Sequence, residues 1–215
     1  MNYLSLFFTE NTLGHVFCDW ALTKSFNVVS LNMKIMGVAR LIMKRLFLIG
    51  GTMGVGKTTV CKVLKHELPN SVFLDGDWCW DSSPFQVTEE TKTMVLKNIK
   101  YLLNSFLSCT AYDNIIFCWV MHEQEIIDEL ISGLNTENIR VRMISLVCSP
   151  ESLMRRIRID VSAGIREADA VERSLSRLPL YEELNTEKFD VSNITAEVAA
   201  KRIIETDDEG IQNYC

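Results

Sequence analysis

The stretch Gly51-Thr52-Met53-Gly54-Val55-Gly56-Lys57-Thr58 decides the fold of this chain. Its spacing fits G-x-x-x-x-G-K-[ST], the pattern of a phosphate-binding loop. The glycines let the backbone wrap with its N–H groups pointing inward, and the positive end of the following helix adds to the attraction for phosphate. The motif therefore predicts that the chain binds a nucleoside triphosphate.

The residues on either side of this loop support that prediction. The apolar run 46–49 precedes the loop and is typical of a buried parallel strand. After the loop, apolar residues repeat at helical spacing from Val60 to Leu68 and stop at Pro69. We expect the loop and the first helical turn to bind the nucleotide through Gly51, Thr52, Met53, Gly54, Val55, Gly56, Lys57, Thr58 and Thr59. Within this set, Lys57 is expected to reach the terminal phosphates, and the Thr58 hydroxyl to ligate Mg²⁺.

Composition and charge narrow the class of protein. The 215 residues are 47% apolar and 23% charged, which is ordinary for a globular chain that buries a proper core. The formal net charge of −6 argues against a general nucleic-acid-binding surface. Seven scattered cysteines with no C-x-x-C pair are typical of reduced thiols, and no uncharged apolar run is long enough to span a membrane. We expect a cytoplasmic protein, monomeric or homodimeric, without nucleic-acid or membrane partners.

From Met43 onward, strand patterns alternate with helix patterns, which predicts an α/β fold with a parallel sheet and helices on both faces. Ser149-Pro150-Glu151 is typical of a helix start, with a capping serine, proline at the first helical position and an acid in the first turn. After the first strand, we expect strands at 72–74, 114–120, 141–147 and 189–191. We expect helices at 88–107 and 123–134, a helix that begins at residue 150, and a last helix from residue 195 through Ile204.

The ends of the chain fit this alternation poorly. Residues 1–42 contain apolar side chains but no sustained period, and we expect an extension that the domain at 43–205 does not need. The alternative is an N-terminal helix or two packed on that domain, since apolar segments are seldom simply solvated. We expect residues 206–215 to be a polar C-terminal tail.

Two carboxylates, Asp75 and Asp77, follow the second expected strand and flank Gly76. Because ligands bind at the carboxyl ends of parallel strands, this turn and the phosphate-binding loop should share one edge of the sheet. One carboxylate is then expected to hold Mg²⁺ together with Thr58, and the other to orient or deprotonate an acceptor hydroxyl. The alternative is a plain strand-ending turn, which Asp-Gly favours on its own.

A second group of candidates is cationic or aromatic. Arginine forks stabilise the charge that phosphoryl transfer spreads over oxygen atoms, and of the arginines at 155, 156, 158, 166, 173 and 177 we select Arg156 and Arg166 as catalytic. Gly164 lies between these two, where a small mobile lid could turn. Trp78, Trp80 and Phe85 follow the carboxylates and are candidates for a stacking wall, although core packing explains such aromatics about as well.

Together, the loop, Asp75-Gly76-Asp77 and an arginine-bearing helix resemble the P-loop small-molecule kinases, over about residues 44–205. These include the adenylate kinase, shikimate kinase, adenylylsulfate kinase and chloramphenicol phosphotransferase types. The resemblance implies a three-layer P-loop NTPase fold with strand order 2-3-1-4-5, and ATP and Mg²⁺ as cofactors. It implies phosphate and Mg²⁺ roles for Lys57 and Thr58, a carboxylate near the metal for Asp75, and a carboxylate facing a small-molecule acceptor for Asp77.

One feature departs from the wider phosphate-loop class. The third expected strand ends in Trp119-Val120-Met121-His122, with no acid to help hold Mg²⁺. The function expected is transfer of the γ-phosphate of ATP to a nucleoside, a nucleotide or another hydroxyl compound. The alternatives are a nucleotide-hydrolysing switch and a binding module without turnover. The sequence lacks N-K-x-D, the motif that guanine-specific switches usually carry. The paired carboxylates argue against a module that only binds nucleotide.

Overall fold

The computed structural model describes residues 43–167 and 169–212, and they contain one five-stranded parallel sheet. Its order is β2-β3-β1-β4-β5, the order that the resemblance implies. The strands are β1 (Lys44–Gly50), β2 (Ser71–Asp75), β3 (Asn114–Cys118), β4 (Ile139–Val147) and β5 (Glu187–Asp190). Because β1 pairs with both β3 and β4, the loop after β1 lies at the middle of the sheet, where the strand order reverses and α/β proteins bind ligands.

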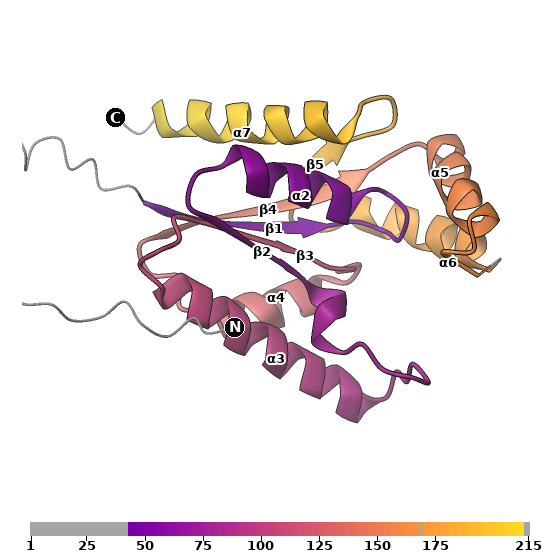
Figure 1. The fold of residues 1–215 in the computed structure, drawn as a ribbon, viewed down its shortest axis with the longest axis horizontal. Coiled ribbons are helices and arrows are strands. Elements are labelled where there is room, and N and C mark those ends of the chain that lie inside the picture. Colours follow the sequence, from indigo (N-terminus) through magenta and orange to yellow (C-terminus); the bar gives the residue numbers. More distant parts are fainter. Residues whose placement is uncertain (1–42, 168, 213–215) are drawn as a thin grey trace, which may run out of the picture. The chain divides into compact units, whose positions relative to one another are not determined.

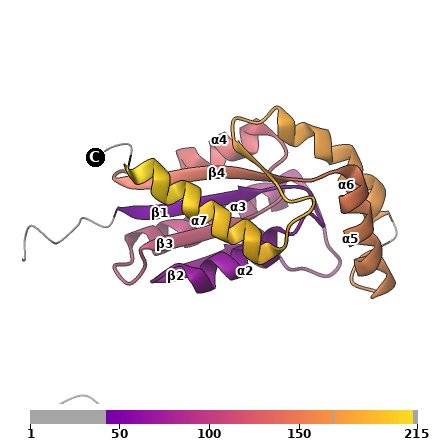
Figure 2. The ribbon, with the colours of Figure 1, turned by 90° about the horizontal axis from the view of Figure 1, so that it is seen from above.

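Helices cover both faces of the sheet. Helices α2 and α7 lie on one face, α3 and α4 lie on the other, and α5 and α6 lie beyond the carboxyl ends of the strands (Figures 1 and 2). The helices are α2 (Lys57–Glu67), α3 (Glu89–Ser108), α4 (Gln124–Ser132), α5 (Pro150–Ser162), α6 (Ala170–Arg177) and α7 (Ala196–Gln212), with short 3₁₀ turns η1 (Gly76–Cys79) and η2 (Leu178–Glu182). No helix in this part of the chain has the length and apolar character needed to cross a bilayer.

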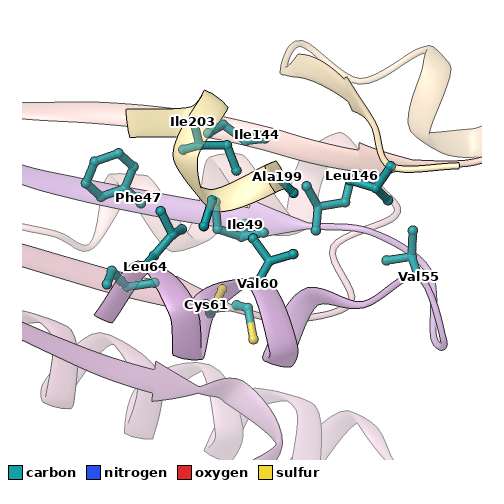
Figure 3. Packing of buried hydrophobic residues seen from close by; sticks show 14 of the residues in the cluster. Phe47, Ile49, Val55, Val60, Cys61, Leu64, Ile144, Leu146, Ala199 and Ile203 are labelled. Atoms are coloured by element: carbon teal, nitrogen blue, oxygen red, sulfur yellow. The ribbon is translucent and has the colours of Figure 1, made fainter. Parts of the chain in front are cut away.

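The central strand shows how the apolar run before the loop builds two cores. Successive side chains of a strand point to opposite faces, so Phe47 and Ile49 pack under α2 and α7, whereas Leu46 and Leu48 pack under α3 and α4. Figure 3 shows the first of these clusters, in which Leu64 of α2 approaches the sheet. All five side chains are at most 1% exposed, and full burial of such a side chain is worth about 1.5–3 kcal/mol. The apolar run thus fixes the loop on a rigid strand.

Helix starts lie where the sequence predicts them. Thr88 caps α3 and forms a capping box with Thr91, and Ser149 caps α5 with Pro150 at the first helical position. Helix α6 and the two 3₁₀ turns were not predicted. The eight residues of α6 are mostly polar and too short to show a helical period.

The C-terminal end differs from the expected polar tail. Helix α7 continues to Gln212, and Asp207, inside the stretch expected to be solvated, is fully buried. Its carboxylate pairs with Arg45 at 2.9 Å, Arg140 at 3.1 Å and Arg142 at 3.7 Å, at the start of β1 and β4. These three cations offset the charge of the buried acid, so Asp207 belongs to the packed part of α7 and not to a solvated tail. The expectation for residues 1–42 lies outside the described residues.

Candidate active site

The phosphate-binding loop joins β1 to α2 at the carboxyl edge of the sheet. Gly56 precedes the first turn of α2 with a φ of 110°, and no side chain caps the helix, so its first N–H groups remain available to an anion. Gly54 has a φ of 82°, and a Cβ built there would lie 2.4 Å from Cγ1 of Ile157 on α5. Only glycine fits this left-handed position so close to α5. Gly54 therefore lets α5 pack directly against the phosphate-binding loop.

Seven of the nine residues expected to bind the nucleotide line a cavity of about 750 Å³, which is within the usual size of a ligand site. They form the continuous stretch from Met53 to Thr59. The other two, Gly51 and Thr52, do not line it. The buried Thr52 hydroxyl donates to the backbone oxygen of Ser174 on α6 at 3.0 Å, so this side chain ties the loop to α6.

Lys57 bends back over the loop. Its Nζ donates to the backbone oxygens of Gly51 at 2.9 Å and Thr52 at 3.1 Å, and the side chain lines the cavity. Burial lowers the pKa of Lys57, while the nearby thiols and carboxylates act in the opposite direction. The ammonium group is therefore held at the loop by acceptors that phosphate oxygens can replace.

Thr58 and Asp75 meet directly. The Thr58 hydroxyl donates to Oδ2 of Asp75 at 2.7 Å, and the other carboxylate oxygen accepts the backbone N–H of Asp77 at 3.2 Å. Asp75 is only 6% exposed, and these two donors fix the orientation of its carboxyl group. A hydroxyl and a carboxylate at this distance form the oxygen pair that a small divalent cation prefers.

Asp77 lies two residues further on and remains exposed to solvent at the cavity wall. Although Asp77 is exposed on one side, neighbouring groups partly shield its carboxyl from water, and this raises its pKa; the charge of Asp75 adds to the rise, while the charge of Lys57 opposes it. Gly76 lies between the two acids because a Cβ there would lie 2.6 Å from the Trp119 ring. The Asp-Gly-Asp turn is thus packed on the residue that follows β3.

Four of the six arginines line the cavity. They are Arg156, Arg166, Arg173 and Arg177, and the selected Arg156 and Arg166 are both among them. Arg156 donates to the backbone oxygen of Val55 in the loop at 2.8 Å and to that of Val191 after β5. Arg166 pairs with Asp160 at 2.8 Å. Arg156 therefore braces the loop in this structure, whereas Arg166 is held by a single carboxylate at the cavity.

Two of the three candidates for a stacking wall line the cavity. Trp80 and Phe85 line the cavity, but Trp78 does not; its ring contacts Phe73 edge-to-face at 5.3 Å. The sequence did not single out Trp119 and His122, which also line the cavity. Both residues follow the buried strand β3, which pairs with β1. Because the carboxyl ends of neighbouring parallel strands meet at the ligand-binding edge, this position in the sequence could have indicated them.

The described residues contain no group of three or more His, Cys, Asp or Glu side chains placed to hold a metal ion. An ion at this loop would instead be shared between protein oxygens and nucleotide phosphates, as Mg²⁺ commonly is. The hydrogen-bonded Thr58–Asp75 pair fits that requirement without an acid on β3.

A phosphate-binding loop at the reversal point of a 2-3-1-4-5 sheet defines a P-loop NTPase fold of the kinase-like kind. The chain belongs to the AAA domain family, whose model matches residues 48–173. No curated protein matches the sequence.

Several solved structures share this fold. The tunicamycin resistance protein of Deinococcus radiodurans matches with a TM-score of 0.59 and 20% identity, over 76% of this chain and 95% of that chain. A sugar kinase from Janibacter sp. matches with a TM-score of 0.58 and 18% identity, over 77% and 95%. Shikimate kinase from Acinetobacter baumannii, in complex with shikimate, matches with a TM-score of 0.53 and 19% identity, over 78% and 94%. At such identities the likeness is one of fold.

Proposed function

We propose that the protein is an ATP-dependent kinase that moves the γ-phosphoryl group of ATP to a hydroxyl of a small molecule. The observation that carries the proposal is that one cavity is lined by both the phosphate-binding loop and Asp77. The aromatic side chains of Trp80, Phe85 and Trp119 line the same cavity. A protein that only bound or hydrolysed nucleotide would not need a lined space for a second molecule next to an acid.

The loop and the first turn of α2 provide the binding half of the site. Backbone N–H groups from Met53 to Thr59 and the Nζ of Lys57 would hold the phosphates, and Thr58 with Asp75 would hold Mg²⁺. When bound, Mg²⁺ offsets the charge of the phosphates during transfer. Arg166 is placed to donate to the transferred group once its single carboxylate partner is exchanged for phosphate oxygens.

Asp77 supplies the acid–base half of the site. The acceptor oxygen forms a bond to the γ-phosphorus, the bond to the β,γ-bridging oxygen breaks, and ADP leaves with the bonding pair. The proton of the acceptor hydroxyl passes to the Asp77 carboxylate, whose raised pKa makes it a better base than an ordinary aspartate. Sugar kinase and shikimate kinase among the similar folds support transfer to a small molecule.

The test is the release of ADP by the full chain in the presence of ATP and Mg²⁺, with and without a panel of hydroxyl compounds. We expect at least one compound to stimulate ADP release and to gain a phosphoryl group detectable by mass. ADP release that no acceptor changes would contradict the proposal and favour a nucleotide-hydrolysing switch. Binding of ATP without any release would favour a binding module.

A further inference from the structure

The segment that follows β3 forms one side of the cavity. It runs from Trp119 to His122, and Trp119, Val120 and His122 line the cavity. Its first residue lies against the Asp-Gly-Asp turn, because the Trp119 ring occupies the space into which a Cβ at Gly76 would project. Asp77, the base of the proposed transfer, therefore lies at one end of this segment.

Arg177, the last residue of α6, lies near the other end of the segment. Its side chain is half-buried and lines the same cavity. Burial, and then the charge of Arg177, lower the pKa of His122, so the guanidinium is near enough for its charge to act on the imidazole. Three residues of chain span at most about 11 Å. A small molecule that lies along this segment can therefore contact both Asp77 and Arg177.

The other three arginines that line the cavity are already occupied by protein acceptors. Arg156 donates to backbone oxygens of the loop and of the residue after β5. Arg166 pairs with Asp160 at 2.8 Å, and Arg173 pairs with Asp169 at 3.0 Å. Within the cavity, these three guanidinium groups offer an anion only what their present partners release.

Arg177 has no such partner. Within residues 43–167 and 169–212, no carboxylate lies at ion-pair distance from its guanidinium and no acceptor is hydrogen-bonded to it. The two lysines of the cavity differ in this respect, because Lys57 bonds to loop oxygens and Lys92 pairs with Glu89 at 2.8 Å. A guanidinium is always charged and carries five N–H donors. An unpaired one at a cavity wall is a site for an oxyanion.

The strand order separates Arg177 from the arginine that braces the loop. Strands β3 and β4 lie on opposite sides of β1, and β5 lies beyond β4. Arg156 reaches the residue that follows β5, whereas Arg177 acts on the residue His122 that follows β3. Asp77 follows β2, which pairs with β3. Arg177 therefore shares the side of the cavity on which Asp77 lies.

We propose that the acceptor carries a carboxylate or a phosphate group, and that Arg177 binds this group while the acceptor hydroxyl lies at Asp77. Both groups present two oxygens that match the parallel N–H groups of a guanidinium. This inference rests on the proposed kinase function and narrows it, because it removes uncharged sugars, alcohols and nucleosides from the expected acceptors.

The experiment uses pairs of hydroxyl compounds that differ in one anionic group. The carboxylate pairs are 4-(hydroxymethyl)benzoate and shikimate, each with its methyl ester, and the phosphate pair is thymidine 3′-monophosphate with thymidine. The full chain, loaded with a non-hydrolysable ATP analogue and Mg²⁺, is titrated with each compound by calorimetry. We expect at least one anionic probe to bind about tenfold or more tightly than its neutral partner, since hydrogen bonds to charged groups are the strong ones.

Variants assign the preference to one side chain. Arg177→Ala should weaken binding of that anionic probe about tenfold or more and leave its neutral partner unchanged. Arg177→Lys keeps the charge without the fork and should restore part of the loss. Arg158→Ala is the matched control, because Arg158 is an exposed arginine of α5 that does not line the cavity. The melting temperature of each variant without ligand shows that it is folded.

The affinity for the ATP analogue separates the acceptor site from the nucleotide site. It should stay unchanged in Arg177→Ala, because the loop and Lys57 hold the phosphates. An Arg177→Ala variant that loses affinity for the analogue as strongly as for the probe would place Arg177 at the nucleotide and overturn the assignment.

The remaining failures are also distinguishable. If no anionic probe binds more tightly than its neutral partner, or if the preference survives in Arg177→Ala, the assignment is overturned and the kinase proposal stands. Failure of the wild type to bind the ATP analogue at all would overturn the kinase proposal itself.

Discussion

The Thr58 hydroxyl donates a 2.7 Å hydrogen bond to the Asp75 carboxylate, joining the first turn of α2 to the end of β2. The two residues are 17 positions apart in the chain, and β3 lies between β1 and β2 in the sheet. Their contact therefore depends on the strand order and on α2 and β2, the elements that connect the two residues along the chain. In the proposed kinase, these two oxygens would be the protein ligands of the metal ion that a triphosphate on the loop carries.

Removing either member of this pair should change the response to Mg²⁺. Asp75→Asn and Thr58→Ala should each raise the Mg²⁺ concentration at half-maximal transfer and lower the rate at saturation, because one oxygen ligand is weakened or lost. The measurement is transfer rate over a Mg²⁺ series. Asp81→Asn, an exposed acid outside the cavity, is the control. An unchanged Mg²⁺ dependence in both variants would remove the pair from the metal site.

Asp77 should control the chemical step and its pH dependence. Asp77→Asn keeps the size of the side chain but loses its basicity, so kcat should fall about 10²–10⁴-fold while ATP affinity barely changes. The free carboxyl must be ionised to accept a proton, and its pKa is raised above the ordinary 3.8. Activity of the wild type should therefore fall as the pH is lowered through that raised pKa.

The profile of kcat/KM against pH measures this directly. The acid limb should lie above the pH range of an ordinary aspartate and should disappear in Asp77→Asn, whereas Asp81→Asn should retain it. Near wild-type transfer by Asp77→Asn would show that the carboxylate is not the base.

The buried Asp207 should matter for stability rather than for activity. Asp207→Ala removes the buried carboxylate that Arg45, Arg140 and Arg142 share, and breaking a buried ion pair costs about 3–5 kcal/mol. The free energy of unfolding in urea should fall by that amount. Lys201→Ala, which removes an exposed 3.8 Å pair with Glu205 on the same helix, should change it by less than about 0.5 kcal/mol. Equal effects of the two variants would argue against the buried network.

Truncation tests the proposed boundaries of the domain. A chain from Met43 to Cys215 should fold, and ATP with Mg²⁺ should raise its melting temperature, because β1, the loop and α2 are complete from Lys44 onward. A chain that also stops at residue 205 should be much less stable, since it lacks Asp207. An insoluble product from Met43 would contradict the proposal that residues 1–42 are dispensable.

Much of this arrangement follows from local patterns. The apolar run before the loop predicts a buried strand, and Ser149-Pro150 predicts a helix start, because both signals lie within a few residues. Asp75 and Asp77 could be placed at the binding edge because all parallel strands end there. None of these inferences needs a contact between distant segments.

Other parts depend on contacts that a single sequence does not display. Arg156 was selected as a catalytic arginine, yet its guanidinium is occupied by backbone oxygens of the loop and of Val191, which lies 35 positions away. Trp119 was noted only as the place where an acid is missing, and its packing against Gly76 emerges once β2 and β3 pair. Asp207 looked solvated because its three cations begin strands far earlier in the chain.

The measurement that tests the central claim most directly is transfer of isotopically labelled γ-phosphate from ATP to an acceptor by the wild type and by Lys57→Ala. The account predicts a labelled acceptor and a stoichiometric amount of ADP with the wild type. It predicts a fall of about 10²–10³-fold or more in Lys57→Ala, whose fold should stay intact because the lysine bonds only to loop oxygens. Label found only in inorganic phosphate, or equal transfer by both proteins, would contradict the account.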